Sequence, residues 1–209
     1  MGEYEAFKRL GDLCLSLAFF IVSLPFLALI SILIWIFDGN PVIFKQVRLG
    51  KNMKPFIFYK FRTMRKDVDP RIHEEYIKKL LSGEDKKNKE GLYKASYSQS
   101  DYTKIGRILR KLSLDELPQL WNVLKGDMSL IGPRPAIPYE VKYYPDKKYF
   151  ERFKVFQGLT GYWQIYKRSS GGMLEMLEMD VEYVKKQSAA FDFVIFFKTL
   201  FHILKHKGA

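Results

Sequence analysis

Two adjacent acids, Asp115 and Glu116, and an arginine in a proline-flanked turn are the residues of this sequence best suited to chemistry. The turn has the sequence Gly-Pro-Arg-Pro and carries Arg134 between two prolines of fixed φ, so it presents a planar guanidinium to a phosphate or a carboxylate. A carboxylate at a helix start beside such an arginine indicates phosphoryl chemistry. The simpler interpretation is that the two acids only complement the positive end of a helix dipole.

A short helix is expected to position the acids. Pro118 has no N–H and fits only the first turn, so Asp115 would be the N-cap of a helix over 116–125 that ends at Gly126. Ser113 and Glu116 have the spacing of a capping box, which would start the helix two residues earlier. Either start places both acids at a helix N-terminus.

The longer run around these acids resembles the bacterial sugar transferase family, the monotopic phosphoglycosyl transferases. The resemblance is carried by LSLDELPQL at 112–120, NVLKGDMS at 122–129 and GPRP at 132–135. KFRTM at 60–64 and GLTGYWQ at 158–164 also resemble segments of that family. Asp180 and Tyr183 stand at family-like positions in a helix expected over 174–186.

The resemblance implies an enzyme that moves a sugar phosphate from a UDP-sugar to a polyprenyl phosphate, such as undecaprenyl phosphate, and releases UMP. This would be the first membrane step of glycoconjugate assembly. Asp115 would attack the donor phosphorus and form a covalent aspartyl-phosphosugar, while Glu116 would orient groups or accept a proton. Mg²⁺ beside Asp115 would neutralise the diphosphate, and Arg134 would add a bidentate contact.

Five further residues are expected to bind substrate: Lys60, Arg62, Arg110, Gln164 and Arg168. Lys60 and Arg62 alternate with aromatic residues in a strand-like segment and would therefore share one face. Arg110 shares a face of a short expected helix with Arg107. Gln164 ends the family-like GLTGYWQ segment, and Arg168 stands near the place of a family Gly-Arg element. A solvated basic face explains either arginine-containing pair equally well.

Residues 13–37 form an apolar stretch long enough to cross a bilayer. Basic residues both precede and follow it, and because such residues mark the cytoplasmic side, both flanks favour the same side. Pro25 in its middle would kink a helix, and Ser23 could bond the freed carbonyl. A re-entrant helix that returns to the same face satisfies these facts and agrees with the family resemblance. A single kinked span is the alternative.

The composition narrows the class of partner. A 47% share of hydrophobic residues excludes a disordered chain, and the formal charge of +12 predicts an anionic partner. The basic residues are spread along the chain without zinc-finger or RRM-type signatures, so membrane phospholipids and a diphosphate substrate are favoured over nucleic acid. Cys14 is the only cysteine, which excludes an intrachain disulfide.

The remaining pattern predicts the elements around the site. Strands over 42–47 and 56–61 predict a small β-hairpin, and residues 65–103 are expected to form a variable surface loop after an initial helix that ends before Gly83. The C-terminal segment 191–206 is amphipathic and too short to span a bilayer. It would lie at the membrane interface or pack on the core.

The expected fold is therefore α+β: a compact, mainly helical catalytic domain at 40–209 with a small β-hairpin. A re-entrant membrane helix-hairpin at 1–39 and amphipathic interfacial helices would anchor it, as a monotopic protein on the cytoplasmic face of a bacterial inner membrane. The alternative function is that of a non-catalytic membrane-surface protein that binds anionic lipids. A hydrolase with Asp115 and Glu116 as an acid/base pair is disfavoured, because adjacent helical residues point about 100° apart.

Overall fold

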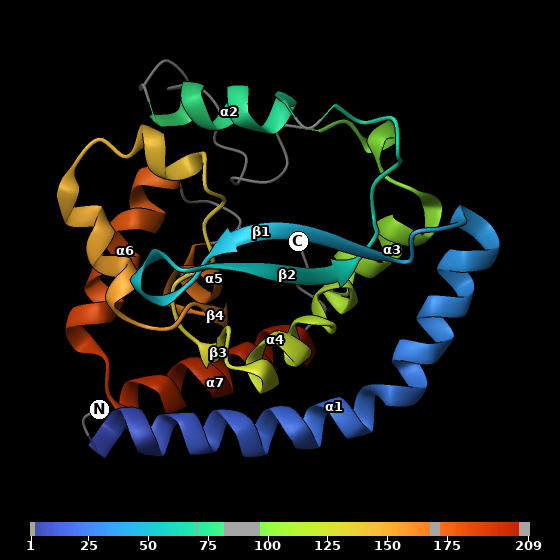
Figure 1. Cartoon of the computed structure of the whole chain (residues 1–209). Coiled ribbons are helices and arrows are strands. Elements are labelled where there is room, and N and C mark those ends of the chain that lie inside the picture. Colours follow the sequence, from blue (N-terminus) through green and yellow to red (C-terminus); the bar gives the residue numbers. More distant parts are fainter. Residues whose placement is uncertain (1–2, 70, 82–96, 168–171, 205–209) are drawn as a thin grey trace.

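The computed structural model describes residues 3–69, 71–81, 97–167 and 172–204. Helices dominate it, with two small sheets of two strands each among these residues (Figure 1). The α-helices are α1 (Glu3–Asp38), α2 (Arg71–Leu81), α3 (Lys104–Lys111), α4 (Gln119–Lys125), α5 (Tyr162–Tyr166), α6 (Met173–Lys186) and α7 (Ala189–Leu204). The strands are β1 (Ile43–Leu49), β2 (Pro55–Phe61), β3 (Ser129–Ile131) and β4 (Gly158–Thr160).

Short 3₁₀ turns connect these elements, and they are η1 (Lys51–Met53), η2 (Gln99–Asp101), η3 (Leu114–Glu116), η4 (Glu140–Tyr143) and η5 (Lys147–Lys154). The expected β-hairpin is confirmed: β1 and β2 pair antiparallel from Ile43 opposite Phe61 to Leu49 opposite Pro55. The parallel pair of β3 and β4 was not predicted. The helix expected within 65–103 is α2, whereas residues 82–96 of that expected loop lie outside the described residues.

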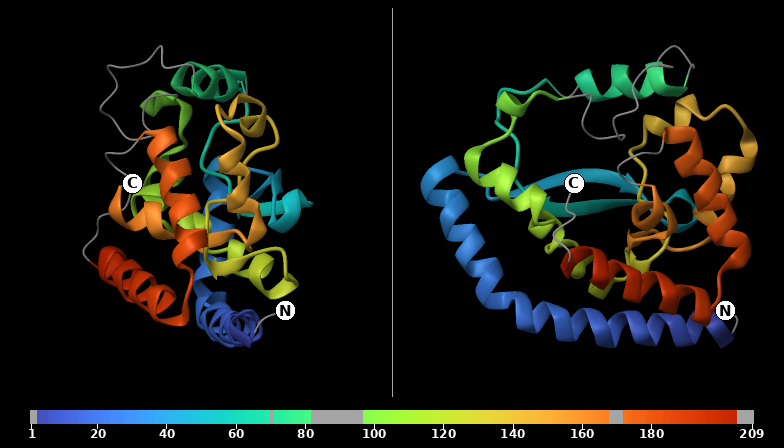
Figure 2. Two further views of the ribbon diagram at one scale, coloured as in Figure 1. Left: turned by 90° about the vertical axis from the view of Figure 1, so that its left-hand side faces the viewer. Right: turned by 180° about the vertical axis from the view of Figure 1, so that it is seen from behind.

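The first helix, α1, is a single element that bends partway along its length (Figure 1, Figure 2). Pro25 lies inside it and, having no N–H, cannot donate to the carbonyl of Ile21 one helical turn earlier. The Ser23 hydroxyl was expected to bond that carbonyl, but it donates to Phe20 O at 3.0 Å. A serine hydroxyl in a helix can donate to the carbonyl three or four residues earlier. Ser23 therefore bonds the carbonyl of Phe20 and not the carbonyl of Ile21 that Pro25 leaves without a donor.

The apolar surface of α1 is mostly uncovered. The helix is long and apolar enough to cross a membrane, and 17% of its most apolar window is buried, whereas a core helix of a soluble protein would be mostly buried. The buried positions of its first arm are polar: Asp12, Ser16 and Ser23. The second arm buries Ile30 and Ile34 against Phe61 of β2 and Leu109 of α3.

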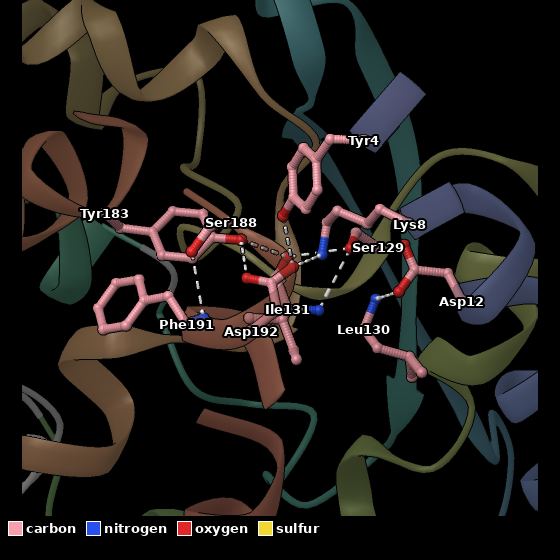
Figure 3. A network of polar contacts seen from close by, with 10 residues as sticks. All are labelled: Tyr4, Lys8, Asp12, Ser129, Leu130, Ile131, Tyr183, Ser188, Phe191 and Asp192. Atoms are coloured by element: carbon pink, nitrogen blue, oxygen red, sulfur yellow. Dashed lines mark hydrogen bonds and ion pairs between the residues drawn. The ribbon is translucent and has the colours of Figure 1, made fainter. Parts of the chain in front are cut away.

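A polar network fastens the first arm of α1 to the domain (Figure 3). Asp192 at the start of α7 accepts from Tyr4 (2.8 Å), Lys8 (2.6 Å) and Tyr183 of α6 (2.7 Å). Asp12 accepts from the backbone N–H of Leu130 in β3 at 3.2 Å. The main core cluster lies above this arm and joins β2, α4, β3, α5, α6 and α7.

Candidate active site

A pocket of about 520 Å³ opens between α1, α7 and the short elements of the domain. Its wall on the side of α1 and α7 is apolar, with Phe19, Val22, Phe26, Phe196 and Leu200. Its other wall is polar and strongly charged, with Arg48, Lys60, Arg110, Asp115, Glu116, Gln119, Arg134 and Gln164. The pocket therefore combines a charged floor with an apolar side, which suits a ligand that has both characters.

The two acids lie in η3, a 3₁₀ turn that leads into α4, and Asp115 is only 7% exposed. Both expected caps are wrong: Pro118 occupies the N-cap position of α4, and neither Ser113 nor Pro118 makes a side-chain capping bond. Because Pro118 has no N–H to donate to Leu114, the chain closes a tighter turn in which Leu117 N bonds Leu114 O at 3.3 Å. The expected end of α4 at Gly126 is confirmed, with a φ of 93°.

The buried amide of Asn122 holds α4 against β2. Its Oδ1 accepts from Tyr59 N at 3.1 Å, and its Nδ2 donates to Ile57 O at 2.7 Å. The same amide donates to Asp127 at 3.0 Å, just beyond the end of the helix. One side chain thus ties the strand that carries Lys60 to the helix that follows the two acids.

The surroundings of Lys60 in the pocket perturb its pKa. Burial lowers its pKa to about 8; the carboxylate of Asp115 opposes this shift, and the neighbouring cations Arg110 and Arg48 add to it. A lysine with a pKa near neutrality in a pocket with two acids is a functional-site signal, and the geometry supports that signal here.

The loop that carries Arg134 is fixed by the parallel pair of β3 and β4. Gly132 N donates to Thr160 O at 2.9 Å, and Gly158 N donates to Pro133 O at 2.8 Å. The backbones approach so closely that a Cβ on Gly158 would lie 2.1 Å from Gly132 N. Glu140 Oε1 lies 3.8 Å from Arg134 Nη1 and gives the guanidinium a buried counter-charge.

A buried ion pair supports this loop from behind. Arg152 Nη2 lies 2.7 Å from Asp180 Oδ2 in α6, and the two side chains are 0% and 1% exposed. The same Nη2 donates to Arg134 O at 2.6 Å, so α6 fixes the backbone of the arginine that lines the pocket. Burial raises the pKa of Asp180 to about 6, against the opposing effect of Arg152.

Comparisons with known proteins identify the family of the chain. The family model described as bacterial sugar transferase matches residues 3–206. The chain belongs to the bacterial sugar transferase family. It is 37% identical to "Uncharacterized sugar transferase EpsL" of Bacillus subtilis, over 96% of this chain and 89% of that protein.

Two longer relatives of this sugar transferase carry names with a stated activity. The chain is 36% identical to "Undecaprenyl-phosphate galactose phosphotransferase" of Salmonella typhimurium over 97% of its own length, and 42% identical to "Galactosyl transferase CpsE" of Streptococcus agalactiae over 82%. It spans 41% and 36% of those two proteins.

The pocket of this sugar transferase gathers most of the residues expected from the sequence. Asp115, Glu116, Lys60, Arg110, Arg134 and Gln164 all line it, and so does Ser23. Gln164 Oε1 is buried there without a hydrogen-bond partner among the described residues. Arg168 lies outside the described residues.

Arg62 does not reach the pocket, contrary to its expected pairing with Lys60. Its backbone N–H still donates to Val42 O at 2.9 Å just past the end of β2, but its Nη2 donates to Asp38 O (2.5 Å) and Gly39 O (2.7 Å), so the end of α1 holds the guanidinium away from the pocket. Arg107 likewise lines a different cavity from Arg110.

Arg48 is a pocket residue that sequence reasoning missed, because it was counted among the charges that flank the membrane segment. It is buried, donates to Pro135 O at 2.9 Å and lies over the ring of Phe58 at 5.1 Å. The available signal was its place in β1 opposite Phe56, which puts an arginine on the face of a hairpin that packs on the core.

The acids of the pocket fit one mode of metal binding. Among the described residues no group of three or more His, Cys, Asp or Glu side chains is placed to hold a metal ion. Mg²⁺, however, is commonly held by one or two carboxylates together with the phosphates of a substrate. Asp115 and Glu116 of the pocket can supply the carboxylates.

Proposed function

We propose that this sugar transferase moves a sugar phosphate from a UDP-sugar to a polyprenyl phosphate and releases UMP, with Asp115 as the nucleophile. The observation that carries the proposal is the pocket itself, in which two acids lie among Arg48, Lys60, Arg110 and Arg134 beside an apolar wall. The charged floor suits a diphosphate, and the apolar wall suits a polyprenyl chain. The name of the Salmonella relative states phosphotransfer of galactose with undecaprenyl phosphate, which supports this chemistry, and the name of the Streptococcus relative states galactosyl transfer.

In the first step a carboxylate oxygen of Asp115 forms a bond to the β-phosphorus of the donor. The bond from that phosphorus to the bridging oxygen breaks, and UMP leaves with the electron pair. A carboxylate and a diphosphate repel each other, so the positive charges of Lys60, Arg110 and Arg134 are needed at the same place. The result is an acyl phosphate that links Asp115 to the phosphosugar.

In the second step a phosphate oxygen of the polyprenyl phosphate forms a bond to the same phosphorus. The bond to Asp115 breaks and restores its carboxylate, so the product is a polyprenyl diphosphosugar. Glu116 lines the same pocket and would accept the proton when the acceptor binds as a monoanion, or orient the acceptor when it does not.

Mg²⁺ is part of the proposal, held by Asp115 and Glu116 together with substrate phosphates; when bound, it supplies charge neutralisation on the diphosphate. Its requirement is tested by chelation, which should stop UMP release and allow recovery on adding Mg²⁺.

The proposed setting is monotopic, on the cytoplasmic face of a bacterial inner membrane, with residues 1–39 as the membrane part and 40–209 as the catalytic domain. Both ends of α1 contact the same domain: near its start Glu5 pairs with Lys51 at 3.0 Å and Lys8 pairs with Asp192 at 2.6 Å, and at its last residue Asp38 O accepts from Arg62 Nη2 at 2.5 Å. A straight span would carry one end away from the domain, so these pairs support a re-entrant α1. The exposed Phe193, Phe197 and Phe201 of α7 support an interfacial position for that helix.

Asp115→Asn tests the mechanism. With donor and Mg²⁺ but no acceptor, the unchanged protein should release about one UMP per active site and retain the phosphosugar on a peptide that contains Asp115. The nearly isosteric amide should abolish both the burst and the turnover. Initial rates with both substrates should follow a ping-pong law.

Glu116→Gln is the matched variant, since it changes the neighbouring acid in the same way. It should slow turnover yet leave some labelling. A ternary-complex rate law, or label retained by the Asp115→Asn protein, would show that the acceptor attacks the donor directly.

A further inference from the structure

A second cavity, of about 760 Å³, lies where α1 ends and α3 begins. Its lining shares no residue with the pocket that holds Asp115. Phe37 and Asp38 border it from the last turn of α1, and Thr103 and Lys104 border it from the start of α3. It is therefore a separate site, on the side of the molecule opposite α6 (Figure 1).

The guanidinium of Arg62 is the buried feature of this cavity. The side chain is only 6% exposed and lines the cavity, and its Nη2 is used by the carbonyls at the end of α1. Its Nε and Nη1 are buried without hydrogen-bond partners among the described residues. Two unpaired donors on a buried cation are costly, and an anion with several oxygens would satisfy both.

The charge around the cavity also favours an anion. Its cationic lining residues are Arg62, Arg65, Lys66, Lys104 and Arg107, and its acidic ones are Asp38 and Asp67. Asp67 already pairs with Arg65 at 3.4 Å, whereas Asp38 has one buried oxygen without a partner. The five cations outnumber the two acids, and the positive end of α3 adds to them.

Exposed apolar side chains beside the cavity indicate what kind of anion it meets. Trp35, Ile36 and Phe37 of α1 are 59%, 60% and 68% exposed, and Ile108 of α3 is 56% exposed. Phe37 also lines the cavity. A tryptophan next to basic residues at the end of an apolar helix is typical of the depth of lipid headgroups.

We propose that this cavity binds the phosphate of an anionic phospholipid headgroup through Arg62 and the surrounding Arg65, Lys66, Lys104 and Arg107. The lipid would hold the second arm of α1 and the start of α3 at the membrane surface, outside the catalytic pocket. This inference rests on the proposed membrane setting of α1, but it does not depend on the proposed transfer chemistry.

The test measures lipid retained by the full chain in detergent. Native mass spectrometry should detect phosphatidylglycerol bound with about one-to-one stoichiometry, and phosphatidylcholine should bind much more weakly. The double variant Arg65→Gln with Arg107→Gln removes two cations from the cavity. Arg62 is left unchanged, because it also bonds the carbonyls at the end of α1. Each basic residue near an anionic lipid contributes about fivefold in affinity, so this double variant should bind phosphatidylglycerol about 25-fold more weakly.

Lys147→Gln with Lys185→Gln is the matched control, since it removes two exposed cations from η5 and α6. It should keep the affinity of the unchanged protein. Equal losses in both double variants, or no loss in either, would overturn the site. Inorganic phosphate at matched ionic strength distinguishes the source of the anion: displacement of phosphatidylglycerol at equal concentration would overturn the lipid assignment. UMP release is not the readout, so a failure here leaves the transferase proposal standing.

Discussion

Lys60 shows how the charges of the pocket depend on one another. It is half-buried among Arg48 and Arg110, which oppose its protonation, and beside Asp115, which favours it. A free pocket thus holds a lysine whose proton is weakly bound, and a diphosphate would restore its affinity for that proton. Lys60 must be protonated to attract the diphosphate donor, yet it holds its proton least tightly before the donor binds.

The pH dependence of donor binding follows from this balance. The protonated fraction of Lys60 falls as pH rises through about 8, so the pocket loses a positive charge there. We expect kcat/KM for the UDP-sugar, which reports the free enzyme, to fall by roughly tenfold from pH 8.5 to pH 9.5. Lys60→Arg keeps its charge over this range and should remove that decline.

Lys147→Arg provides the control, because this exposed lysine lies in η5 outside the pocket. It should leave the alkaline decline unchanged. If the decline persists in Lys60→Arg, another group is responsible and Lys60 is not the titrating contact.

Residue types, local spacing and the family resemblance together predicted much of the pocket. Asp115, Glu116 and Arg134 were singled out as two acids at a helix start near a proline-flanked arginine, whereas Lys60 and Gln164 came from segments that resemble the family.

The prediction for Arg62 was wrong because its guanidinium bonds carbonyls at the end of α1, a contact that strand alternation cannot show. Arg48 was missed because the first strand was expected to end at residue 47, so the alternation that places Arg48 on the same face as Phe56 was not followed that far.

At the level of elements, the short ones could not be predicted. β3 and β4 have three residues each, too few for any periodicity, and their pairing joins Ser129 to Gly158 across the chain. Likewise the 3₁₀ turn η3 differs from a first α-helical turn by single hydrogen bonds. The β3–β4 pair depends on close backbone contacts, which a sequence shows only as glycines, and η3 depends on the bond from Leu117 N to Leu114 O.

Gly158→Ala tests whether these contacts position Arg134. An added Cβ would lie 2.1 Å from Gly132 N and 2.4 Å from Thr160 O, so the β3–β4 pair must shift. We expect a loss of about 1–3 kcal/mol in the free energy of unfolding, measured by denaturant titration, together with a loss of activity. Gly172→Ala meets nothing within 4 Å and should leave the activity unchanged, with only the smaller loss of stability, below about 1 kcal/mol, that alanine causes at the N-cap of α6.

At the scale of the whole molecule, the first arm of α1 is part of the folded domain. Arg9 donates to Val123 O at 2.9 Å and to Met128 O at 3.2 Å, and so binds carbonyls at the end of α4. Lys8 and Asp192 stand 184 residues apart in the sequence and pair in the structure. Lys8 and Arg9, which in the sequence indicated only the orientation of the membrane segment, therefore also bind other parts of the domain. No local sequence pattern could reveal these long-range contacts.

These contacts lead to a prediction for topology. Single cysteines replacing Glu3, where α1 begins, and Asn52, in the turn after β1, are introduced in a Cys14→Ser background. Because both ends of α1 contact one domain, an impermeant thiol reagent added outside intact spheroplasts should label neither cysteine. Opening the membrane should expose both to the reagent, as mass spectrometry of the labelled protein would show.

A spanning α1 makes the opposite prediction, because its two ends would then lie on different sides of the bilayer. Labelling of position 3 from outside, with position 52 protected, would establish that arrangement. Pro25→Leu restores the missing backbone hydrogen bond and favours a straight helix. Asp192→Asn weakens the pair with Lys8 that opposes it. Labelling of position 3 from outside should therefore rise more when both changes are combined than with either alone, since each removes one of the several features that direct the first arm back to the domain.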